Sequence, residues 1–599
     1  MTLEKLEFFD ENIPCLAACP VNTNAGMYVA AIADGDDEMA YLTARLPNPF
    51  ASVCGRVCAA PCEDACRRGQ IDRPIAIRAL KRFVTEQFGT ETQNGKVWEK
   101  VAAPPPKELP QSIGIVGGGP AGMACAHDLR QLGYKVTVYE ATDKLGGAMW
   151  LGIPEYRLDR TVLQADIDAI LALGVEVEYN TRLGADVTLT DLRHRHDALF
   201  LSIGATLGRG LDIEGHDADG VFKAIEFLIN MNRGFEVSVG ERVIVIGGGD
   251  VAMDAARTAL RAAEYARQTE AGEQPGAYDA DDESASMTLS IDAARSAARA
   301  GAHSISVISL ESEEEMPAHD FEVEEARHEG VEFVHRRGPA RILVENGKVT
   351  GLETIGVRSV FDEEGRFAPV FDSEDLKTHA ADTVILAIGQ AIDLEALGSD
   401  GPEISPRRTI AIDNDTGRTS IDGIWSGGDA AKGPRTLIDA IADGRRTAKD
   451  IHRSFGGDVE ERRPGKMVQL RQFHRLTDDY DRWDRVEIPT LESGRRVGLA
   501  EVELGFTEQQ ARCEAARCLR CFANIMLDVS KCVLCALCAD VCPLDLISLV
   551  PAAEVGGTEG TALVLDEAKC IRCALCIERC PTDALSMGMW TGVGVPAWT

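Results

Sequence analysis

The residues of this chain with the clearest potential for chemistry are its cysteines, which are concentrated in two regions. Of the 18 cysteines, 16 fall either between residues 15 and 66 or between residues 518 and 580. Disulfides are disfavoured in the cytoplasm, where we expect this chain, so clustered thiols indicate metal binding. Their spacing decides which metal site each region is able to build.

The C-terminal region contains one motif written twice. Residues 531–543 read KCVLCALCADVCP and residues 569–581 read KCIRCALCIERCP. This pattern, C-x2-C-x2-C-x3-C-P, is typical of a two-cluster bacterial ferredoxin, in which three close cysteines bind one [4Fe–4S] cubane and the fourth binds the other. The alternative, a pair of zinc sites, needs only four thiolates per site and has no use for the Cys-Pro turns. The predicted ligands are Cys532, Cys535, Cys538 and Cys580 for one cluster, and Cys570, Cys573, Cys576 and Cys542 for the other.

A glycine-rich loop follows an apolar strand at residues 113–122, IGIVGGGPAG, and leads into a helical stretch. Such glycines permit a tight turn and let backbone N–H groups approach a pyrophosphate. An acid that ends the next strand, about 20 residues on, is placed to accept a hydrogen bond from a ribose hydroxyl. A second glycine pair follows in DKLGGAMWLGIP. The predicted cofactor-binding residues are Gly117, Gly119, Gly122, Glu140, Gly146 and Gly147.

A second loop of the same type occurs at residues 242–252, RVIVIGGGDVA, with Ala252 in place of the third glycine. Two such loops predict one site for FAD and one for a nicotinamide nucleotide. Residues 421–444 add a strand, a Gly-Gly-Asp turn and a helix. The Asp of this turn can accept a hydrogen bond from the ribityl chain of the flavin. The alternative is a plain strand–helix turn. The predicted residues are Gly247, Gly249, Asp250 and Val251 in the second loop, and Gly428 and Asp429 in the third segment.

Six longer segments, which cover most of residues 13–455, carry a resemblance to a known family. They read CGRVCAAPCEDACRRG, GGGPAGMACAHDL, LGGAMWLGIPEYRL, IGGGDVAMDAARTALR, EEEMPAHDFEVEEA and SGGDAAKGP. In combination they resemble the small (β) subunit of glutamate synthase, a module also found in dihydropyrimidine dehydrogenase and related NAD(P)H–ferredoxin oxidoreductases. Here the module is fused to the ferredoxin-type repeat. The resemblance implies a helical N-terminal iron–sulfur domain followed by an FAD domain with an inserted NAD(P) domain.

The resemblance also suggests how the N-terminal cysteines are used. The family joins E-A-x-R-C-L-x-C to C-x3-C-P within one N-terminal run. Here the second half lies at Cys15 and Cys19, while the first half, EAARCLRC, lies at residues 514–521. We therefore expect Cys518 and Cys521 to fold back onto the N-terminal domain; the alternative is an exposed remnant. The implied ligand sets are Cys518, Cys521, Cys15 and Cys66 for one cluster, and Cys19, Cys54, Cys58 and Cys62 for the other.

The choice between NAD and NADP depends on the strand after the second loop. NADPH-using relatives end this strand with two arginines, but the matching segment here, SISVISLES, has Leu310 and Glu311. A carboxylate accepts a hydrogen bond from a ribose 2′-hydroxyl and repels a 2′-phosphate. This favours NAD, with NADP less favoured; the alternative is an ordinary surface glutamate. An acidic insertion at roughly 262–290 separates Glu311 from the loop and is predicted to be a surface loop.

The elements that must position these residues define the predicted fold class. It is an α/β two-dinucleotide-binding flavoprotein, an FAD-binding domain with an inserted NAD(P)-binding domain, flanked by an α-helical iron–sulfur domain and an α+β ferredoxin-type domain. Pro-rich residues 102–110 and residues 456–465 mark linkers. The predicted domains are 1–103 (helical, iron–sulfur), 110–210 (FAD, first segment), 211–380 (NAD(P)), 381–455 (FAD, second segment), 456–525 (linker with the split cysteine pair) and 526–599 (ferredoxin-like).

Composition limits the remaining possibilities. The chain has 599 residues, 45% of them hydrophobic, and a formal net charge of −34, which argues against nucleic-acid binding. No run approaches the roughly 18 apolar residues of a membrane helix, and the charged N-terminus lacks the apolar core of a signal peptide. We therefore expect a cytoplasmic protein with no membrane span.

Together these features predict an oxidoreductase that passes electrons between NAD(H) and FAD and then through four [4Fe–4S] clusters. No side-chain acid or base is needed, so no catalytic residue is predicted. The expected role is a diaphorase subunit, whose partner is a catalytic subunit such as a 2-oxoacid:ferredoxin oxidoreductase, or ferredoxin itself. The alternatives are a free-standing NAD(P)H:ferredoxin oxidoreductase, a glutamate synthase small subunit, or a relay protein with one inactive nucleotide site. The apolar tail, residues 586–599, either docks a partner or packs on the ferredoxin lobe.

Overall fold

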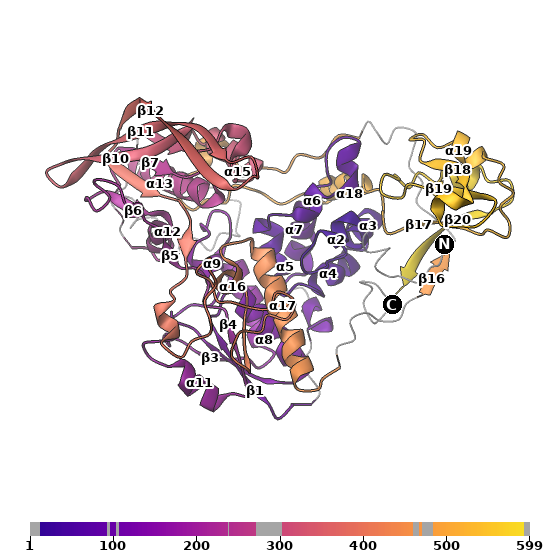
Figure 1. Cartoon of the computed structure of the whole chain (residues 1–599), viewed down its shortest axis with the longest axis horizontal. Coiled ribbons are helices and arrows are strands. Elements are labelled where there is room, and N and C mark those ends of the chain that lie inside the picture. Colours follow the sequence, from indigo (N-terminus) through magenta and orange to yellow (C-terminus); the bar gives the residue numbers. More distant parts are fainter. Residues whose placement is uncertain are drawn as a thin grey trace. The chain divides into compact units, whose positions relative to one another are not determined.

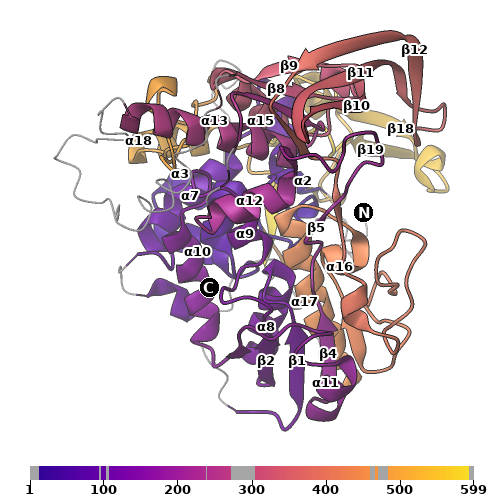
Figure 2. The ribbon, with the colours of Figure 1, turned by 90° about the vertical axis from the view of Figure 1, so that its left-hand side faces the viewer.

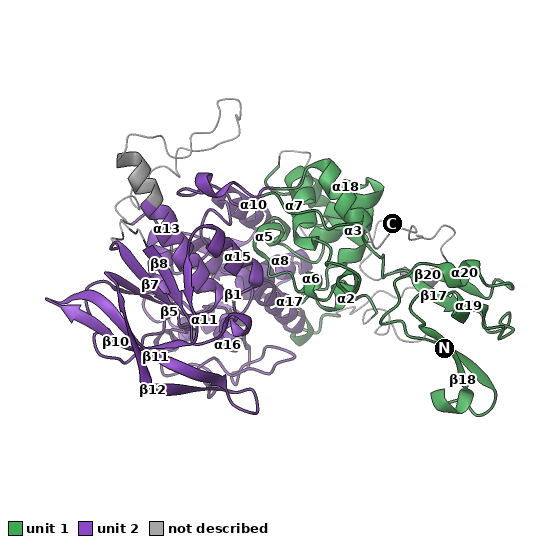
Figure 3. Ribbon diagram, turned by 90° about the horizontal axis from the view of Figure 1, so that it is seen from above, with its two compact units in different colours: residues 1–103, 452–489, 505–599 green, residues 104–451, 490–504 purple. Residues whose placement is uncertain are grey.

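The computed structural model divides the chain into two compact units, which Figure 3 colours separately. Unit 1 comprises Met1–Ala103, His452–Pro489 and Gly505–Thr599, and unit 2 comprises Pro104–Ile451 and Thr490–Leu504. The structure describes residues 12–92, 96–102, 107–235, 237, 239–270, 302, 304–458, 466–469 and 483–591. Parts of five segments interpreted from the sequence lie outside these residues: 1–11 at the N-terminus, 271–290 of the insertion, 103–106 and 459–465 of the linkers, and 592–599 of the tail.

Unit 2 contains a five-stranded parallel sheet that carries the first glycine loop. Figure 2 shows β2, β1 and β4 side by side, with α8 (Pro120–Leu132) alongside. The last four residues of β1 are buried, as expected for a central parallel strand. The outer strand β15 comes more than 200 residues after β4, so a long insertion precedes completion of the sheet. The strand order is β15 (Ile424–Ser426), β4 (Ala198–Leu201), β1 (Ser112–Val116), β2 (Lys135–Tyr139) and β3 (Glu176–Glu178).

The inserted residues form a second five-stranded parallel sheet, which carries the second glycine loop. Three helices contribute to the apolar core beside it: α12 (Ala224–Asn232), α13 (Asp250–Glu270) and α15 (Asp320–His328). The strand order is β6 (Val221–Lys223), β13 (Thr383–Leu386), β7 (Arg242–Ile246), β8 (Ser304–Ile308) and β9 (Glu332–Val334). The two connections between the sheets pair as β5 (Leu207–Gly208) and β14 (Gln390–Ala391). This architecture confirms the predicted fold class of one dinucleotide-binding lobe inserted in another.

Two predicted boundaries differ from the structure. Residues 381–455 are predicted from sequence to belong to the FAD lobe, but β13 pairs with β6 and β7 of the second sheet. Buried parallel strands share one apolar pattern, so the local sequence does not show which sheet a strand joins. Residues 490–504, predicted to lie within a linker, belong to unit 2. There Arg261 donates hydrogen bonds to the carbonyl oxygens of Gly498 and Ala500.

The second lobe also carries a three-stranded antiparallel sheet that the sequence analysis does not anticipate. Its strands are β10 (Arg337–Glu345), β11 (Lys348–Phe361) and β12 (Phe367–Ala380). Every residue of β12 is exposed or half-buried. The strand therefore lacks the alternation of buried and exposed side chains by which a half-buried strand is recognised in a sequence.

Unit 1 combines a helical region with a small α+β lobe. Helix α18 (Glu508–Ala516) packs on α3 and α7 of the helical region, although it lies more than 400 residues after them; Figure 1 shows these helices together. In the lobe, β20 (Leu585–Thr591) pairs with β17 (Asn524–Leu527) and β16 (Lys466–Gln469), and β18 (Ile547–Pro551) pairs with β19 (Thr561–Leu565). The N-terminal helices are α2 (Pro14–Ala17), α3 (Ala25–Asp34), α4 (Asp37–Arg45), α5 (Ala51–Val57), α6 (Pro61–Asp64) and α7 (Ile77–Phe88).

Of the helices that the structure describes, none combines the length and apolar character needed to cross a bilayer.

Candidate cofactor sites

The first glycine loop connects β1 to α8 through backbone that only glycine accommodates. Gly117 has φ +101°, and its N–H donates a 2.9 Å hydrogen bond to the carbonyl oxygen of Tyr139. A Cβ added to Gly122 would lie 2.0 Å from the Gly117 carbonyl oxygen. Gly119 is the residue immediately before α8. The loop therefore holds the start of α8 close to the end of β1, as a pyrophosphate site requires.

The other residues predicted at the FAD site lie against this loop. The Gly146 N–H donates to the carbonyl oxygen of Gly118 at 2.8 Å, and a Cβ added to Gly147 would lie 2.8 Å from the Gly119 Cα. In the third segment, Gly428 has φ +63°, and a Cβ added there would lie 3.1 Å from the Ala121 Cβ, at the start of α8.

Asp429 begins the short helix α16 (Asp429–Lys432), directly after the Gly428 turn. Burial raises the pKa of its carboxyl group to about 6. Its Oδ1 accepts a hydrogen bond from the Arg435 N–H at 3.2 Å. The structure thus places Asp429 in the segment that packs on the start of α8. A hydrogen bond donated by a ligand hydroxyl would favour the ionised form of the Asp429 carboxyl group.

The second loop has the same form between β7 and α13. Gly247 has φ +142°, and a Cβ there would lie 2.3 Å from the carbonyl oxygen of Ala387, while a Cβ on Gly249 would meet nothing within 4 Å. Asp250, the first residue of α13, accepts hydrogen bonds from the N–H of His319 at 2.9 Å and pairs with its Nδ1 at 2.8 Å. Although burial opposes it, this pairing lowers the pKa of Asp250.

The acids predicted to contact ribose hold equivalent positions at the two loops. A Cβ added to Gly118 would lie 3.2 Å from Glu140 Oε2, and one added to Gly248 would lie 3.0 Å from Glu311 Oε2. The Gly118 N–H donates to Glu140 Oε2 at 2.9 Å. Despite the long insertion before it, β8 pairs in parallel with β7 and delivers Glu311 to the middle glycine of the second loop.

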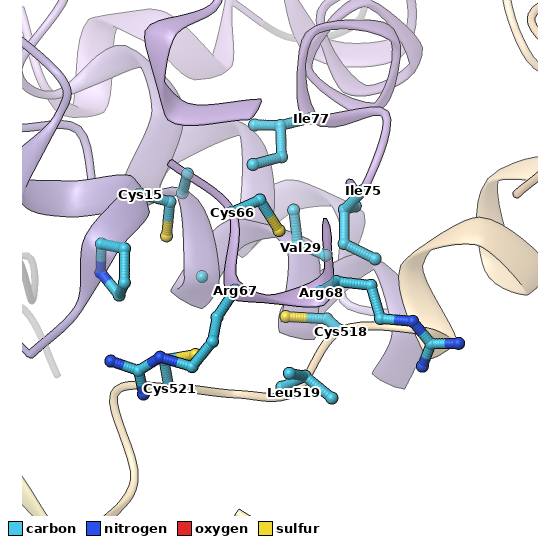
Figure 4. Close-up of a pocket in the computed structure, with 13 residues that line it drawn as sticks. Cys15, Val29, Cys66, Arg67, Arg68, Ile75, Ile77, Cys518, Leu519 and Cys521 are labelled. Atoms are coloured by element: carbon cyan, nitrogen blue, oxygen red, sulfur yellow. The ribbon is translucent and has the colours of Figure 1, made fainter. Parts of the chain in front are cut away.

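A pocket in unit 1 is lined by cysteines from distant parts of the chain (Figure 4). Cys15 and Cys66 come from the N-terminal helical region, and Cys518 and Cys521 come from the segment after α18. Burial, reinforced by neighbouring thiols, raises the pKa of Cys518 to about 12 and holds the pKa of Cys15 well above its usual value. Such thiols stay protonated at neutral pH unless a cation replaces the proton.

A buried ion network fixes the segment that carries Cys518. Glu514, which is fully buried, accepts hydrogen bonds from the N–H groups of Ala76 at 2.8 Å and Val486 at 2.9 Å, and from Arg517 Nη1 at 2.7 Å. Arg517 also donates to Asp72 Oδ1 at 2.9 Å. Each buried charge therefore has partners, which is the condition for tolerating it in a core. The network docks this segment against the N-terminal helices. Cys518 and Cys521 are therefore not part of an exposed remnant, which was the alternative to folding back.

A second group of thiols surrounds a buried lysine. Lys81 of α7 is 7% exposed, and burial alone would lower the pKa of its ammonium group, but the neighbouring thiols raise that pKa overall. Helix α5, which carries one of these thiols, lies close against α7, since a Cβ added to Gly55 would be 2.9 Å from the Arg82 backbone. The thiols around Lys81 are those of Cys54, Cys19, Cys58 and Cys62.

The two copies of the C-terminal motif bring their cysteines together in the small lobe. One pocket is lined by Cys532, Cys535, Cys538 and Cys580. In the other group, burial and then the nearby thiols raise the pKa of Cys576 to about 12; these thiols are Cys570, Cys573, Cys538 of the first group, and Cys542. Among the described residues, no three His, Cys, Asp or Glu side chains converge as the ligands of a single metal ion would, whereas a cubane is held through irons at separate corners.

Two cysteines lie outside the four groups, and the buried lysine was not predicted from the sequence. Cys125 is buried in α8 and Cys513 is exposed on α18. Lys81 is not singled out by the sequence analysis, although its spacing from Ile77 and Val84 places it on the buried face of α7. A lysine on an otherwise apolar helix face is the signal that could have found it.

Three protein families match different stretches of this chain. Residues 111–444 match the family described as pyridine nucleotide-disulphide oxidoreductase. Residues 10–93 match the 4Fe-4S domain II of dihydropyrimidine dehydrogenase, and residues 531–584 match the 4Fe-4S dicluster domain. Cys518 and Cys521 lie outside all three matches, and the structure places them in a pocket with Cys15 and Cys66.

Individual proteins extend the similarity along the chain. The β subunit of the NADP(+)-dependent formate dehydrogenase of Moorella thermoacetica is 34% identical over 85% of this chain and 70% of its own length. The small chain of the NADPH-dependent glutamate synthase of Azospirillum brasilense is 29% identical over 73% of this chain and 85% of its own. Among solved structures, FprA of Mycobacterium tuberculosis aligns at 18% identity with a TM-score of 0.48, over 58% of this chain and 85% of that one. The resemblance to the glutamate synthase small subunit is thereby confirmed.

Proposed function

The chain belongs to the pyridine nucleotide-disulphide oxidoreductase family, and from that premise we propose that it is the electron-transfer, or diaphorase, subunit of a larger oxidoreductase. It is an NAD(P)H-dependent oxidoreductase that takes FAD, a pyridine nucleotide and [4Fe–4S] clusters. Electrons pass between the nucleotide and FAD, and through the clusters to or from a partner. The observation that carries this function is the presence, in one chain, of two glycine loops on separate parallel sheets and of cysteine-lined pockets.

FAD binds at the first loop. Backbone N–H groups at the start of α8 would hold the pyrophosphate, and the glycines of the loop would let it approach the backbone. The Glu140 carboxylate would accept a hydrogen bond from a ribose hydroxyl. Its two oxygens also accept hydrogen bonds from the N–H groups of Gly118 and Thr142, each at 2.9 Å, and these bonds orient the side chain. Asp429 would accept a hydrogen bond from a hydroxyl group of the ribityl chain. The close packing of Gly146, Gly147 and Gly428 on this region supports the assignment.

The nucleotide at the second loop is NAD(H) rather than NADP(H). Glu311 holds the position at Gly248 that Glu140 holds at Gly118, where a carboxylate accepts a ribose 2′-hydroxyl and repels a phosphate. Gly249 leaves space for the pyrophosphate, and Gly247 permits the close approach of the loop to the Ala387 backbone. The relatives from Moorella and Azospirillum are named for NADP(+) and NADPH, so the choice of NAD(H) departs from them.

Four [4Fe–4S] clusters accept and pass on the electrons. Two observations support the ligand sets. Each of two pockets is lined by four of the cysteines. The thiols of a third set raise the pKa of Lys81, and the pKa of Cys576 is raised by the three other thiols of its own set together with Cys538 of the neighbouring set. The N-terminal sets are Cys518, Cys521, Cys15 and Cys66, and Cys19, Cys54, Cys58 and Cys62. The C-terminal sets are Cys532, Cys535, Cys538 and Cys580, and Cys570, Cys573, Cys576 and Cys542.

The chemistry itself belongs to the cofactors. When bound, FAD exchanges a hydride with the nicotinamide and single electrons with the clusters. The residues of the chain bind and orient these groups, and none acts as an acid or base. The Lys81 ammonium lies among the thiols of one proposed set, so its positive charge favours the more negative, reduced state of the cluster bound there.

The partner is a catalytic subunit, such as a 2-oxoacid:ferredoxin oxidoreductase, in a cytoplasmic complex. The relative from Moorella is itself named as a β subunit, which supports a subunit role. The alternative is a free-standing NAD(P)H:ferredoxin oxidoreductase, and one experiment separates the two.

The experiment is an anaerobic purification of the tagged chain from its native source, followed by mass spectrometry and by titration with NADH. We expect a larger redox subunit to co-purify, and NADH to bleach both flavin and iron–sulfur absorbance. Co-purification of no other subunit, together with reduction of free ferredoxin, would establish the alternative. Bleaching of the flavin without the clusters would contradict the relay.

A further inference from the structure

The two copies of the cysteine motif form loops with the same backbone course but different surroundings. Leu534 and Ala536 in the first copy have φ values of +53° and +62°, and Arg572 and Ala574 in the second have φ values of +59° and +65°. Residues of the two loops therefore correspond one to one in space as well as in sequence. Val533 of the first copy corresponds to Ile571 of the second.

The loop of the second copy is covered by the helical region of unit 1. Ile571 is 3% exposed and packs on Leu519, with Ile71, Cys521 and Cys573 beside them. Arg67 Nη1 donates to the carbonyl oxygen of Cys570 at 3.2 Å. An apolar residue between two cysteines thus packs directly on the loop that carries Cys521. Under the proposed ligand sets, this contact joins two successive clusters of the relay.

Arg572, next to Ile571, is 1% exposed and closes the other side of this junction. It donates hydrogen bonds to Glu567 Oε2 at 3.0 Å and Asn524 Oδ1 at 3.3 Å. The junction is therefore a packed, hydrogen-bonded contact.

The corresponding loop of the first copy is exposed. Val533 is 64% exposed and Leu534 is 41% exposed, and Val529, just before the motif, is 74% exposed. Cys535, in the same loop, is an exposed cysteine. We call Val529, Val533 and Leu534 the apolar rim. Exposed apolar side chains gathered beside a redox site are typical of a docking site.

We infer that the apolar rim docks a second iron–sulfur protein, whose own apolar surface covers Val533 as Leu519 covers Ile571. The inference rests on the proposed function, because it takes the cluster bound by Cys532, Cys535, Cys538 and Cys580 as the point of electron exit. The internal junction identifies the occupant: a loop of this conformation already pairs, within this chain, with a cysteine-bearing loop that presents an apolar side chain.

The electron balance of the exit step is simple. One NAD(P)H supplies two electrons, so it yields NAD(P)⁺, one proton and two one-electron-reduced [4Fe–4S] clusters on the acceptor side. The electrons pass one at a time while an acceptor is docked on the rim, and no covalent bond forms between the proteins.

The test uses the full-length holoprotein with NADH as donor and a bacterial 2[4Fe–4S] ferredoxin as the protein acceptor. Val533→Asp places a charge in the rim, and Val529→Asp does so outside the cysteine motif. Val555→Asp is the matched control, because Val555 is 54% exposed in the same lobe but lies outside the rim. We expect kcat/KM for ferredoxin to fall at least tenfold in both rim variants, to stay within twofold of wild type in the control, and to be retained in Val533→Ile.

Iron per chain and bleaching of the clusters by NADH are measured in every variant, so failure of the proposed function is seen separately as a wild-type chain that NADH does not bleach. The inference is overturned if both rim variants keep the wild-type kcat/KM for ferredoxin, or if the control slows as much as they do. It is also overturned if wild-type clusters bleach but pass no electrons to ferredoxin.

Discussion

Removing the thiols of Cys518 and Cys521 tests whether a cluster is shared between distant segments of the chain. Both cysteines line a pocket with Cys15 and Cys66, and burial raises the pKa of Cys518 to about 12. Serine at both positions removes two of four proposed ligands and leaves no substitute thiol in that pocket. We expect the whole cluster to be lost, because two cysteines cannot hold a cubane that needs four.

The expected magnitude follows from counting ligands. Sixteen cysteines in four sets of four hold about 16 irons per chain, and the double variant should hold about 12. The assay is colorimetric iron and acid-labile sulfide per chain after anaerobic reconstitution, with electron paramagnetic resonance of the reduced protein to identify the missing signal. FAD content should be unchanged, because the flavin site is built from other residues.

Cys513→Ala is the matched control, since Cys513 lies on α18, just before Cys518 and Cys521 in the chain, but is exposed. It should keep about 16 irons. An unchanged iron content in the Cys518→Ser/Cys521→Ser variant would refute the shared cluster, and so would an equal loss in the control.

Three charged residues elsewhere lead to further predictions. Glu311→Ala should shift the ratio of kcat/KM for NADH over NADPH about tenfold toward NADPH, since it removes one hydrogen-bond acceptor and a repulsive charge; an unchanged ratio in steady-state kinetics would contradict the NAD assignment. FAD affinity, measured by fluorescence, should weaken as pH falls below about 6, the raised pKa of Asp429, because binding favours the ionised carboxylate; Asp429→Asn should abolish this dependence. Glu514→Ala should lower the free energy of unfolding of unit 1 by about 3–5 kcal/mol, because it removes one of the two carboxylates paired with buried Arg517 and the acceptor of the Ala76 and Val486 N–H groups, and Glu514→Gln should lower it by less; an unchanged free energy of unfolding of Glu514→Ala in calorimetry would show that the ion pair is unimportant.

The two glycine loops could be predicted from the sequence because their geometry demands glycine. Gly122 has the Gly117 carbonyl oxygen where a side chain would start, so the residue type itself records the contact. Glu311 could be predicted only incompletely. Its identity was informative, but its approach to Gly248 across a long insertion depends on the pairing of β8 with β7, which no local pattern encodes.

Other features could not be predicted because they depend on tertiary contacts. The strand β13 has the apolar pattern of either sheet, and β12 has almost no buried side chains from which to recognise it. The spacing of Cys15 and Cys19 shows half of a motif, and only the resemblance to a family suggested where the other half lies. The network of Glu514 and Arg517 that docks this half has no sequence signature.

The pocket shared by Cys15, Cys66, Cys518 and Cys521 also has a consequence for how the protein is made. About 500 residues separate Cys15 from Cys518, so at about 5–20 residues per second the ribosome needs roughly 25–100 seconds to deliver the second half of the site after the first. During that interval the early thiols must be kept reduced and free of the wrong metal. Once loaded, the cluster would close the polypeptide into a ring that contains both nucleotide-binding lobes. Such a cross-link lowers the conformational entropy of the unfolded chain, which stabilises the folded protein by roughly 6 kcal/mol. Insertion of this one inorganic group would therefore mark the point at which both nucleotide-binding lobes have been synthesised.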